Sequence, residues 1–397
     1  MVGEGRILPM VAPYPDLALD PMPTRPHQIL ELLQEKQQEF KRFDQATLQG
    51  LQRYRQSLSQ FSQLAHHCPE AVVESLAAAP QGIIPSHLVW KNREESLNWV
   101  RQRLEGVATF AVDGSQIYPS KDISIPVALV QVGWFENRHE PGGNYEKDVR
   151  LDLLTPEDLR DLSGGLADRK VNLRRFQMEV QRLVDYVEEH GGDRRCLVFL
   201  DGSLVATFAE AFDPETQQVY TRALVTLLQA SETHQVPVVA YVDTSYARDL
   251  TQLLHHSFSL PDLPTLHDAQ LLSPQMQWGD RSPLLRCQRD ILSQHYGSQG
   301  DRVGFLYLKV HDGAPARLEL PLWIAEAGRL EEVLDWVRGE VIIGSGYPYA
   351  IETADQVAVL QASDRQLFYR ILQDWAEQAD LRLRLSRKMV SKARRRS

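Results

Sequence analysis

Three predicted strands carry an aspartate at their end, followed each time by small polar residues. The segments are FAVDGS with Asp113, VFLDGS with Asp201 and VVAYVDTS with Asp243. A strand that ends in Asp delivers a carboxylate to the rim where open α/β sheets place their sites. One such segment is typical of an ordinary turn or a helix N-cap. Three of them predict carboxylates that repel each other at one rim and need a cation to neutralise them.

The chemistry predicted for this rim is that of a hard divalent cation. Oxygen ligands without clustered His or Cys suit Mg²⁺ or Mn²⁺ better than zinc. A pair of such ions about 4 Å apart activates water and stabilises the leaving oxygen of a phosphodiester. The residue types therefore indicate a nuclease, with Asp113 and Asp201 as metal ligands and Asp243 as a possible third strand-end carboxylate.

A further carboxylate is expected from a helix. Glu179 borders the buried stripe of the predicted helix 173–189, because it lies three residues after Phe176. Glu136, which follows the segment GWF, is the alternative. A solvated Glu on a helix flank is nearly as common in such a position, so both interpretations of Glu179 stay open.

The segment GSGYPYAIETAD predicts a turn that leads into a helix. That helix carries Asp355, which we expect to complete the metal site. Tyr349, in the turn, is a candidate for stacking on a base or positioning a phosphate, although a Tyr beside a Pro turn more often packs.

The elements that must position these residues follow from periodicity. Short runs rich in β-branched and aromatic residues predict strands at 107–112, 125–135, 149–154, 196–200, 236–242 and 303–310. Amphipathic patterns predict helices at 173–189, 215–229 and 330–337. Antiparallel strands followed by βαβ units indicate a mixed α/β sheet flanked by helices.

The ends of the chain differ in composition from this core. After an irregular segment 1–24, the region 25–100 is predicted to be helical, with an amphipathic helix or hairpin at 25–66. That helix can pack on the core or pair with a second subunit. The nuclease domain is expected at 105–378, followed by a basic tail at 379–397.

The charge distribution bears on a nucleic-acid partner. The formal charge of the chain is −10, but eight basic residues and no acidic one lie between Arg382 and Arg396, which leaves −18 on the remainder. Such asymmetry indicates an electrostatic arm, and a solvated terminus explains it equally well. The DNA-binding residues predicted in this tail are Arg387, Lys388, Lys392, Arg394, Arg395 and Arg396.

Other classes of protein are disfavoured. The chain contains no GxxxxGK[ST] loop and no GxGxxG motif opening a βαβ unit, which argues against an NTPase. No run of about 18 uncharged apolar residues and no signal-peptide pattern is present, so a cytoplasmic location is expected. Three widely spaced cysteines are expected to be reduced, buried thiols.

In its motifs the sequence resembles the NurA nuclease family. The resemblance rests on VDGS, on LDGSL, on the small polar pair that follows the strand at 236–242, and on GYPYAIETAD, and it covers about 105–375. It implies a ribonuclease H-like fold and Mn²⁺-dependent activity, as a single-strand endonuclease and a 5′–3′ exonuclease, in end resection and double-strand break repair. It also implies a homodimer and partnership with a HerA-type helicase-translocase. By motif, Asp113, Glu179 and Asp201 correspond to the metal-binding carboxylates of the family.

One departure from the family pattern matters for activity. Where the family usually has a His shortly after the Gly-Tyr-Pro turn, this chain has Asp355. An Asp still binds a metal, but the change removes a group that can donate a proton at neutral pH. Two alternatives therefore stay open: a catalytically weak or inactive DNA-binding scaffold on the same fold, and a hydrolase acting on a small phosphate substrate.

Overall fold

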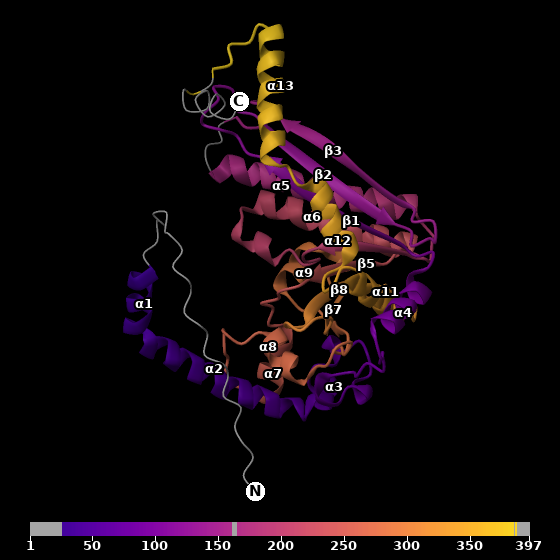
Figure 1. Cartoon of the computed structure of the whole chain (residues 1–397). Helices are drawn as coiled ribbons and strands as arrows, with labels where there is room; N and C mark the ends of the chain where they lie inside the picture. The colour runs from indigo at the N-terminus through magenta and orange to yellow at the C-terminus, as the bar shows by residue number, and fades with distance from the viewer. Residues whose placement is uncertain (1–25, 161–164, 385, 387–397) are drawn as a thin grey trace, which may run out of the picture. The chain divides into compact units, whose positions relative to one another are not determined.

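The structure is a computed structural model that describes residues 26–160, 165–384 and 386 (Figure 1). The chain divides into two compact units, 1–50 and 51–397. In the first, the predicted long helix is interrupted at Lys36 and forms α1 (Pro26–Glu35) and the start of α2 (Gln37–Leu58). Every residue of α1 is exposed, including Ile29 and Leu33, so this helix buries no apolar face of its own within the unit.

The second unit contains an eight-stranded mixed sheet with the order β3-β2-β1-β4-β5-β8-β7-β6. Its strands are β1 (Ala108–Ile117), β2 (Ala128–Asn137), β3 (Tyr145–Leu154), β4 (Cys196–Asp201), β5 (Val238–Val242), β6 (Leu285–Arg286), β7 (Val303–Leu308) and β8 (Ala316–Pro321). Strands β1, β2 and β3 are antiparallel neighbours, whereas β4 and β5 run parallel to β1. The predicted fold class, a mixed α/β sheet flanked by helices, is confirmed.

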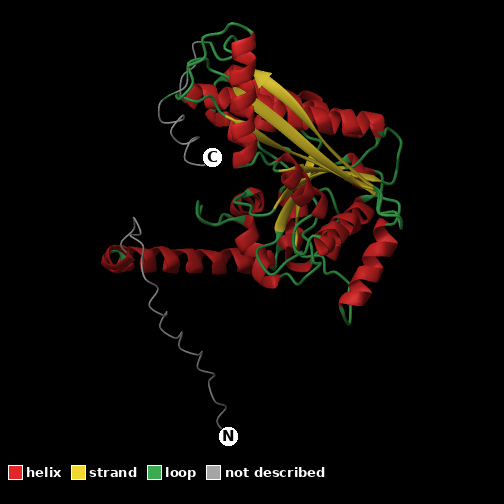
Figure 2. Cartoon of the chain, turned by 45° about the horizontal axis from the view of Figure 1, so that its top comes forward, coloured by secondary structure: helices red, strands yellow, loops and turns green. Residues whose placement is uncertain are grey.

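Helices cover both faces of the sheet (Figure 2). On one face, apolar residues of α5 and α6 pack against alternate residues of the strands, such as Phe110 and Val198. On the other face, α4, α11 and α12 pack against the residues between them, such as Ala111 and Phe199. The remaining helices lie along the connections and at the C-terminal end. The helices that follow α2 are α3 (Leu64–His67), α4 (Arg93–Leu104), α5 (Gly165–Glu189), α6 (Pro214–His234), α7 (Asp249–Phe258), α8 (Asp268–Leu272), α9 (Asp290–His295), α10 (Trp323–Glu326), α11 (Leu330–Ile343), α12 (Tyr349–Ala358) and α13 (Ala362–Gln378).

The first strand differs from its prediction. Instead of ending at Asp113, β1 continues to Ile117, because its antiparallel pairing with β2 extends that far. Its parallel pairing with β4 stops earlier, at Ala111 opposite Phe199. Asp113 therefore lies inside a strand, but just beyond the parallel ladder, so it still reaches the rim where β4 ends.

Other boundaries shift for local reasons. The ladder of β2 begins at Ala128 instead of 125, after Pro126, which has no N–H to donate. The predicted short strand at 149–154 begins at Tyr145, because β2 pairs with it along its full length. None of the described cysteines forms a disulfide, and Cys68 is only half-buried, in contrast to the buried Cys196 and Cys287. Within the described residues, no helix combines the length and apolarity needed to cross a membrane.

Candidate active site

Asp113 and Asp355 face each other across the interface between β1 and α12. Residues of β1 alternate between the two faces of the sheet, and Ala111 lies on the face covered by α12, so Asp113 does as well. The two carboxyl groups are close enough to share a proton in a hydrogen bond. Burial, together with the nearby charges of Asp355 and Asp201, raises the pKa of Asp113 to about 6.

Close packing on β2 brings α12 to this position. A Cβ atom at Gly133 would lie 2.7 Å from the backbone nitrogen of Ala358, so only glycine lets the helix approach this closely. The amide of Gln131 donates to the Ala358 carbonyl at 2.9 Å. Past the helix end, the backbone N–H of Leu360 donates to Oγ of Ser115 at 3.2 Å. The C-terminal part of α12 is thus tied to both β1 and β2.

A buried carboxylate holds the other end of α12. Glu340, on α11, is fully buried and accepts a hydrogen bond from the Ala350 N–H at 2.8 Å. It also accepts one from the hydroxyl of Thr109, on β1, at 2.9 Å. His139 lies 2.9 Å from its Oε1. The helix that carries Asp355 is therefore anchored at both ends relative to the strand that carries Asp113.

Asp201 is the last residue of β4, and Tyr347 orients it. The phenol of Tyr347 donates to Oδ1 of Asp201 at 2.9 Å. The Tyr347 ring packs edge-on against Tyr241 of β5, with ring centroids 5.2 Å apart. Although Asp201 is exposed by surface area, surrounding protein atoms desolvate its carboxylate and raise its pKa, and the charges of Asp355 and Asp243 raise it further.

Glu179 reaches the rim from α5, on the opposite face of β1. Its carboxylate lies directly over Gly114, where a Cβ would approach Oε1 to 2.2 Å. This oxygen is buried and has no hydrogen-bond partner, and the nearest cationic atom is Nε of Arg175 at 3.5 Å. Burial raises the pKa of Glu179 to about 7; Arg175 opposes the rise, while Asp113 and Asp201 add to it.

A fifth carboxylate, Asp243, follows β5 directly and pairs with His311. Nε2 of His311 lies 3.1 Å from Oδ1 of Asp243. The other ring nitrogen, Nδ1, is 2.9 Å from the backbone N–H of Gly313 and accepts its hydrogen bond. Nε2 of the neutral ring therefore carries the proton and donates it to Asp243.

The structure thus brings together most of the predicted site residues. Asp113, Asp201, Glu179 and Asp355 act on each other electrostatically. Tyr349 lies elsewhere: its ring packs edge-on against Phe135, and the described structure gives its hydroxyl no hydrogen bond.

The structure shows the contacts of Glu136, the alternative carboxylate, but does not describe the predicted DNA-binding residues of the basic tail. Glu136 accepts a hydrogen bond from the buried Tyr186 at 2.8 Å and pairs with Arg138. The predicted DNA-binding residues from Arg387 to Arg396 lie outside the described residues.

Two residues of the site were not predicted. Tyr347 belongs to the same Gly-Tyr-Pro turn as Tyr349, and that turn is the signal that could have indicated it. His311 lies in the loop after β7 and follows no motif that would single it out.

The arrangement can attract a cation, but it is not a closed cage. Among the described residues, no group of three or more His, Cys, Asp or Glu side chains is placed so as to hold a metal ion. The carboxylates are neighbours from opposite faces of the sheet. Burial raises the pKa values of Asp113, Glu179 and Asp201, and the negative charges of the neighbouring carboxylates raise them further.

Comparisons with known proteins bear on this site. The model of the NurA domain matches residues 107–360, a range that includes every carboxylate described above. No curated protein matches the chain. Among solved structures, the catalytic domain of human Endonuclease V resembles it with a TM-score of 0.33 and 14% identity, over 81% of this chain and 97% of that chain. That likeness is too distant to bear on the site. The family model covers most of the chain, and the chain belongs to the NurA family of nucleases.

Proposed function

We propose that this protein is a divalent-metal-dependent deoxyribonuclease whose centre is the carboxylate rim. The observation that carries the proposal is the convergence of Asp113, Asp201, Glu179 and Asp355 from four separate elements. A fold has no structural need to gather these charges, because Asp355 raises the pKa of Asp113 and of Asp201, and both of these raise the pKa of Glu179.

The chemistry of the side chains fits a hard cation. All the donors are carboxylate oxygens, which Mn²⁺ and Mg²⁺ prefer. Oε1 of Glu179 is buried without a partner, and a cation would satisfy it. Asp355 raises the pKa of Asp113, and a cation between the two carboxylates would offset their repulsion. We propose that Asp113, Glu179, Asp201 and Asp355 hold the ion, with Mn²⁺ as the first choice.

Such an ion supplies Lewis-acid polarisation of a phosphate and neutralises the charge that develops during hydrolysis. The chain itself orients the reacting groups. Tyr347 fixes the rotamer of Asp201 through its hydrogen bond. The hydrogen bond between Asp243 and His311 fixes a further carboxylate at the same rim.

We further propose that the substrate is DNA, as single strands and as duplex ends, and that both single-strand endonuclease and 5′–3′ exonuclease activity serve end resection in double-strand break repair. The family resemblance supports this choice. The cluster of basic residues after Arg382 supports it as well, because phosphate contacts need Lys and Arg.

We also propose a homodimer and a HerA-type translocase as partners. An exposed apolar stripe on α13 supports the dimer: Leu367, Ile371 and Trp375 recur every four residues and are 44%, 56% and 55% exposed. Support for the translocase comes from the family resemblance alone.

The test is a nuclease assay on end-labelled single-stranded and duplex DNA with Mn²⁺, Mg²⁺ or EDTA. Asp113→Asn and Asp201→Asn should abolish metal-dependent cutting while DNA binding persists. Asp301→Asn is the matched control, because Asp301 is exposed and its carboxylate has no hydrogen bond or ion pair in the described structure. A wild type that binds DNA but cuts nothing with any metal would favour the scaffold alternative.

A further inference from the structure

A cavity of about 690 Å³ opens beside the loops that leave the carboxylate rim. Two of its linings follow site residues in the chain: Thr207 comes after Asp201, and Tyr246 comes three residues after Asp243. Residues from the range 247–256, which includes most of α7, the segment from Arg286 to Asp290, and Glu210 form the rest of its wall. None of the four proposed metal ligands lines this cavity.

Two of the arginines that line the cavity have a buried N–H donor without an acceptor. The Nε atoms of Arg248 and Arg286 are both buried without a hydrogen-bond partner. Arg248 has an ion pair with Asp262 through another nitrogen, but Arg286 has no ion pair in the described part of the chain. A buried N–H without an acceptor costs free energy, which a bound anion would restore.

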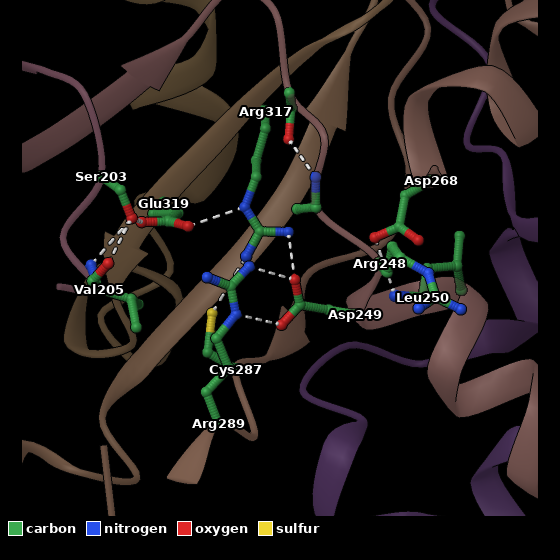
Figure 3. A network of polar contacts seen from close by, with 12 residues as sticks. Ser203, Val205, Arg248, Asp249, Leu250, Asp268, Cys287, Arg289, Arg317 and Glu319 are labelled. Carbon is green, nitrogen blue, oxygen red and sulfur yellow. Dashed lines mark hydrogen bonds and ion pairs between the residues drawn. The ribbon is translucent and has the colours of Figure 1, made fainter. Parts of the chain in front are cut away.

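Arg289, in the same wall, differs from Arg286 because its guanidinium group has carboxylate acceptors. Arg289 binds Asp249 through two hydrogen bonds of 2.9 and 2.6 Å (Figure 3). The fully buried Arg317 contacts the same carboxylate at 2.9 Å. Asp249 is thus already committed to two cations, and its pKa is lowered to about 2 despite burial. None of these contacts involves Arg286.

This buried network also connects the cavity to the proposed active site. Arg317 donates to Oε1 of Glu319 at 2.7 Å, and Oε2 of Glu319 accepts from the Leu204 N–H at 2.8 Å and from the Ser203 hydroxyl at 2.7 Å (Figure 3). Ser203 lies two residues after Asp201. One hydrogen-bonded network therefore joins the wall of the cavity to the loop that follows Asp201.

Tyr246 adds an aromatic surface at the mouth of the cavity. Its side chain is 72% exposed, and its one ring contact is an edge-on approach to His267 with centroids 5.1 Å apart. An exposed Tyr beside arginines with unpaired N–H donors matches the two surfaces of a nucleotide, because a base stacks on the ring while a phosphate binds the cations.

We propose that this cavity is a subsite for single-stranded nucleic acid that holds a nucleotide near the scissile phosphodiester. Arg286 and Arg248 bind its backbone phosphate, and Tyr246 stacks on its base. The inference rests on the proposed nuclease function for its place in the reaction, but the binding it describes requires no metal.

The test measures binding of a labelled oligothymidylate by fluorescence anisotropy in EDTA, where nothing is cut. Arg286→Ala should weaken binding about tenfold and reduce the salt slope by about 0.7, the value for one phosphate contact on a single strand. Tyr246→Ala should weaken binding about tenfold with an unchanged slope. Tyr246→Phe and Arg286→Lys should recover most of the affinity, because they keep the ring and the charge.

Arg222→Ala is the matched control, since Arg222 is an exposed arginine on α6 with no ion pair in the described structure. Unchanged affinity and slope in both alanine variants, with melting curves like wild type, would overturn the subsite. Inorganic phosphate has no base to stack. If Tyr246→Ala weakened competition by inorganic phosphate as much as it weakened oligothymidylate binding, the stacking role of Tyr246 would be overturned. If the wild type cuts DNA and neither alanine variant loses binding affinity, only the subsite is refuted. If both variants lose affinity but the wild type never cuts DNA, the nuclease function is refuted and the subsite stands.

Discussion

Tyr347 and Asp201 are 146 positions apart in the chain, and a 2.9 Å hydrogen bond joins the phenol of one to the carboxylate of the other. The contact places the turn before α12 at the end of β4. It links two parts of the site that are far apart in the sequence, one in the middle of the chain and one near its C-terminal end. Because an oriented carboxylate loses less conformational freedom on binding a ligand, this bond should contribute to activity as well as to stability.

The first prediction concerns this tyrosine. Tyr347→Phe should keep the fold but lower kcat about tenfold, since the rotamer of Asp201 is no longer fixed. Steady-state cutting of labelled DNA measures the effect. Tyr349→Phe is the control, because the structure shows no hydrogen bond from the Tyr349 hydroxyl, and it should cut like wild type. Equal rates for both variants would remove Tyr347 from the site.

The second prediction concerns the residue that departs from the family pattern. Asp355 lies against Asp113, so Asp355→Ala should lower the pKa of Asp113 toward its ordinary value and weaken Mn²⁺ binding about tenfold. Asp355→His restores the residue type usual in the family and should retain cutting. Titration calorimetry and the nuclease assay together check both variants. Undiminished Mn²⁺ affinity in Asp355→Ala would exclude Asp355 as a ligand.

Much of the site could be predicted because strands have simple signatures. A short apolar run before Asp113 or Asp201 places a carboxylate near a rim whatever the exact strand boundary. The true end of β1 could not be predicted, because it is set by the register of pairing with the next strand, β2, and not by the residues of β1 alone.

The strand β8 and the site residue His311 were not predicted, for two different reasons. β8 contains Arg317 and Glu319, which are both buried and ion-paired, so its pattern does not look like a core strand. The role of His311 depends on loops that meet only in three dimensions, and no spacing in the sequence brings it to Asp243.

The third prediction tests the close approach of Glu179. Gly114→Ala places a methyl group 2.2 Å from Oε1 of Glu179 and 2.7 Å from Cγ of Arg175, so one of them must move. We expect a stability loss of about 1–3 kcal/mol and a strong loss of cutting. Gly142→Ala, at a glycine with no atom within 4 Å of the added Cβ, is the neutral control. Thermal melts and the nuclease assay measure the two effects, and full activity in Gly114→Ala would exclude Glu179 from the centre.

The fourth prediction concerns the basic tail. Removing residues 387–397 deletes Arg387, Lys388, Lys392, Arg394, Arg395 and Arg396 and leaves the backbone hydrogen bonds of Arg384 and Ser386 with the 122–124 loop intact. If the tail binds phosphates, the salt dependence of single-strand binding should flatten by about 0.7 for each phosphate that the tail neutralises in the intact protein. Anisotropy titrations over a range of salt measure the slope. An unchanged slope would assign the run to a solvated terminus.

The last prediction concerns stability and pH, and it follows from the anchor of α12. Burial lowers the pKa of His139, but the Glu340 carboxylate against its ring outweighs this, so the pKa lies above its ordinary value of 6.5. Between the two values the folded protein keeps a proton that the unfolded chain releases. The pair therefore stabilises the fold fully below the unfolded pKa, and this contribution is lost as pH rises through the folded pKa.

Melting temperature should accordingly fall as pH rises above the ordinary His value of 6.5, and His139 contributes to this slope together with the raised pKa of Glu179. His139→Gln should melt lower at acidic pH, because Glu340 loses its cationic partner, and its melting temperature should change less across this range. His87→Gln, at an exposed histidine without a hydrogen bond or ion pair in the described structure, should keep the wild-type profile. If His139→Gln retained the wild-type slope, the proton would belong to another group.

Because Glu340 also holds the Ala350 N–H at the start of α12, loss of the charge pair should loosen the helix that presents Asp355 before it affects the strands.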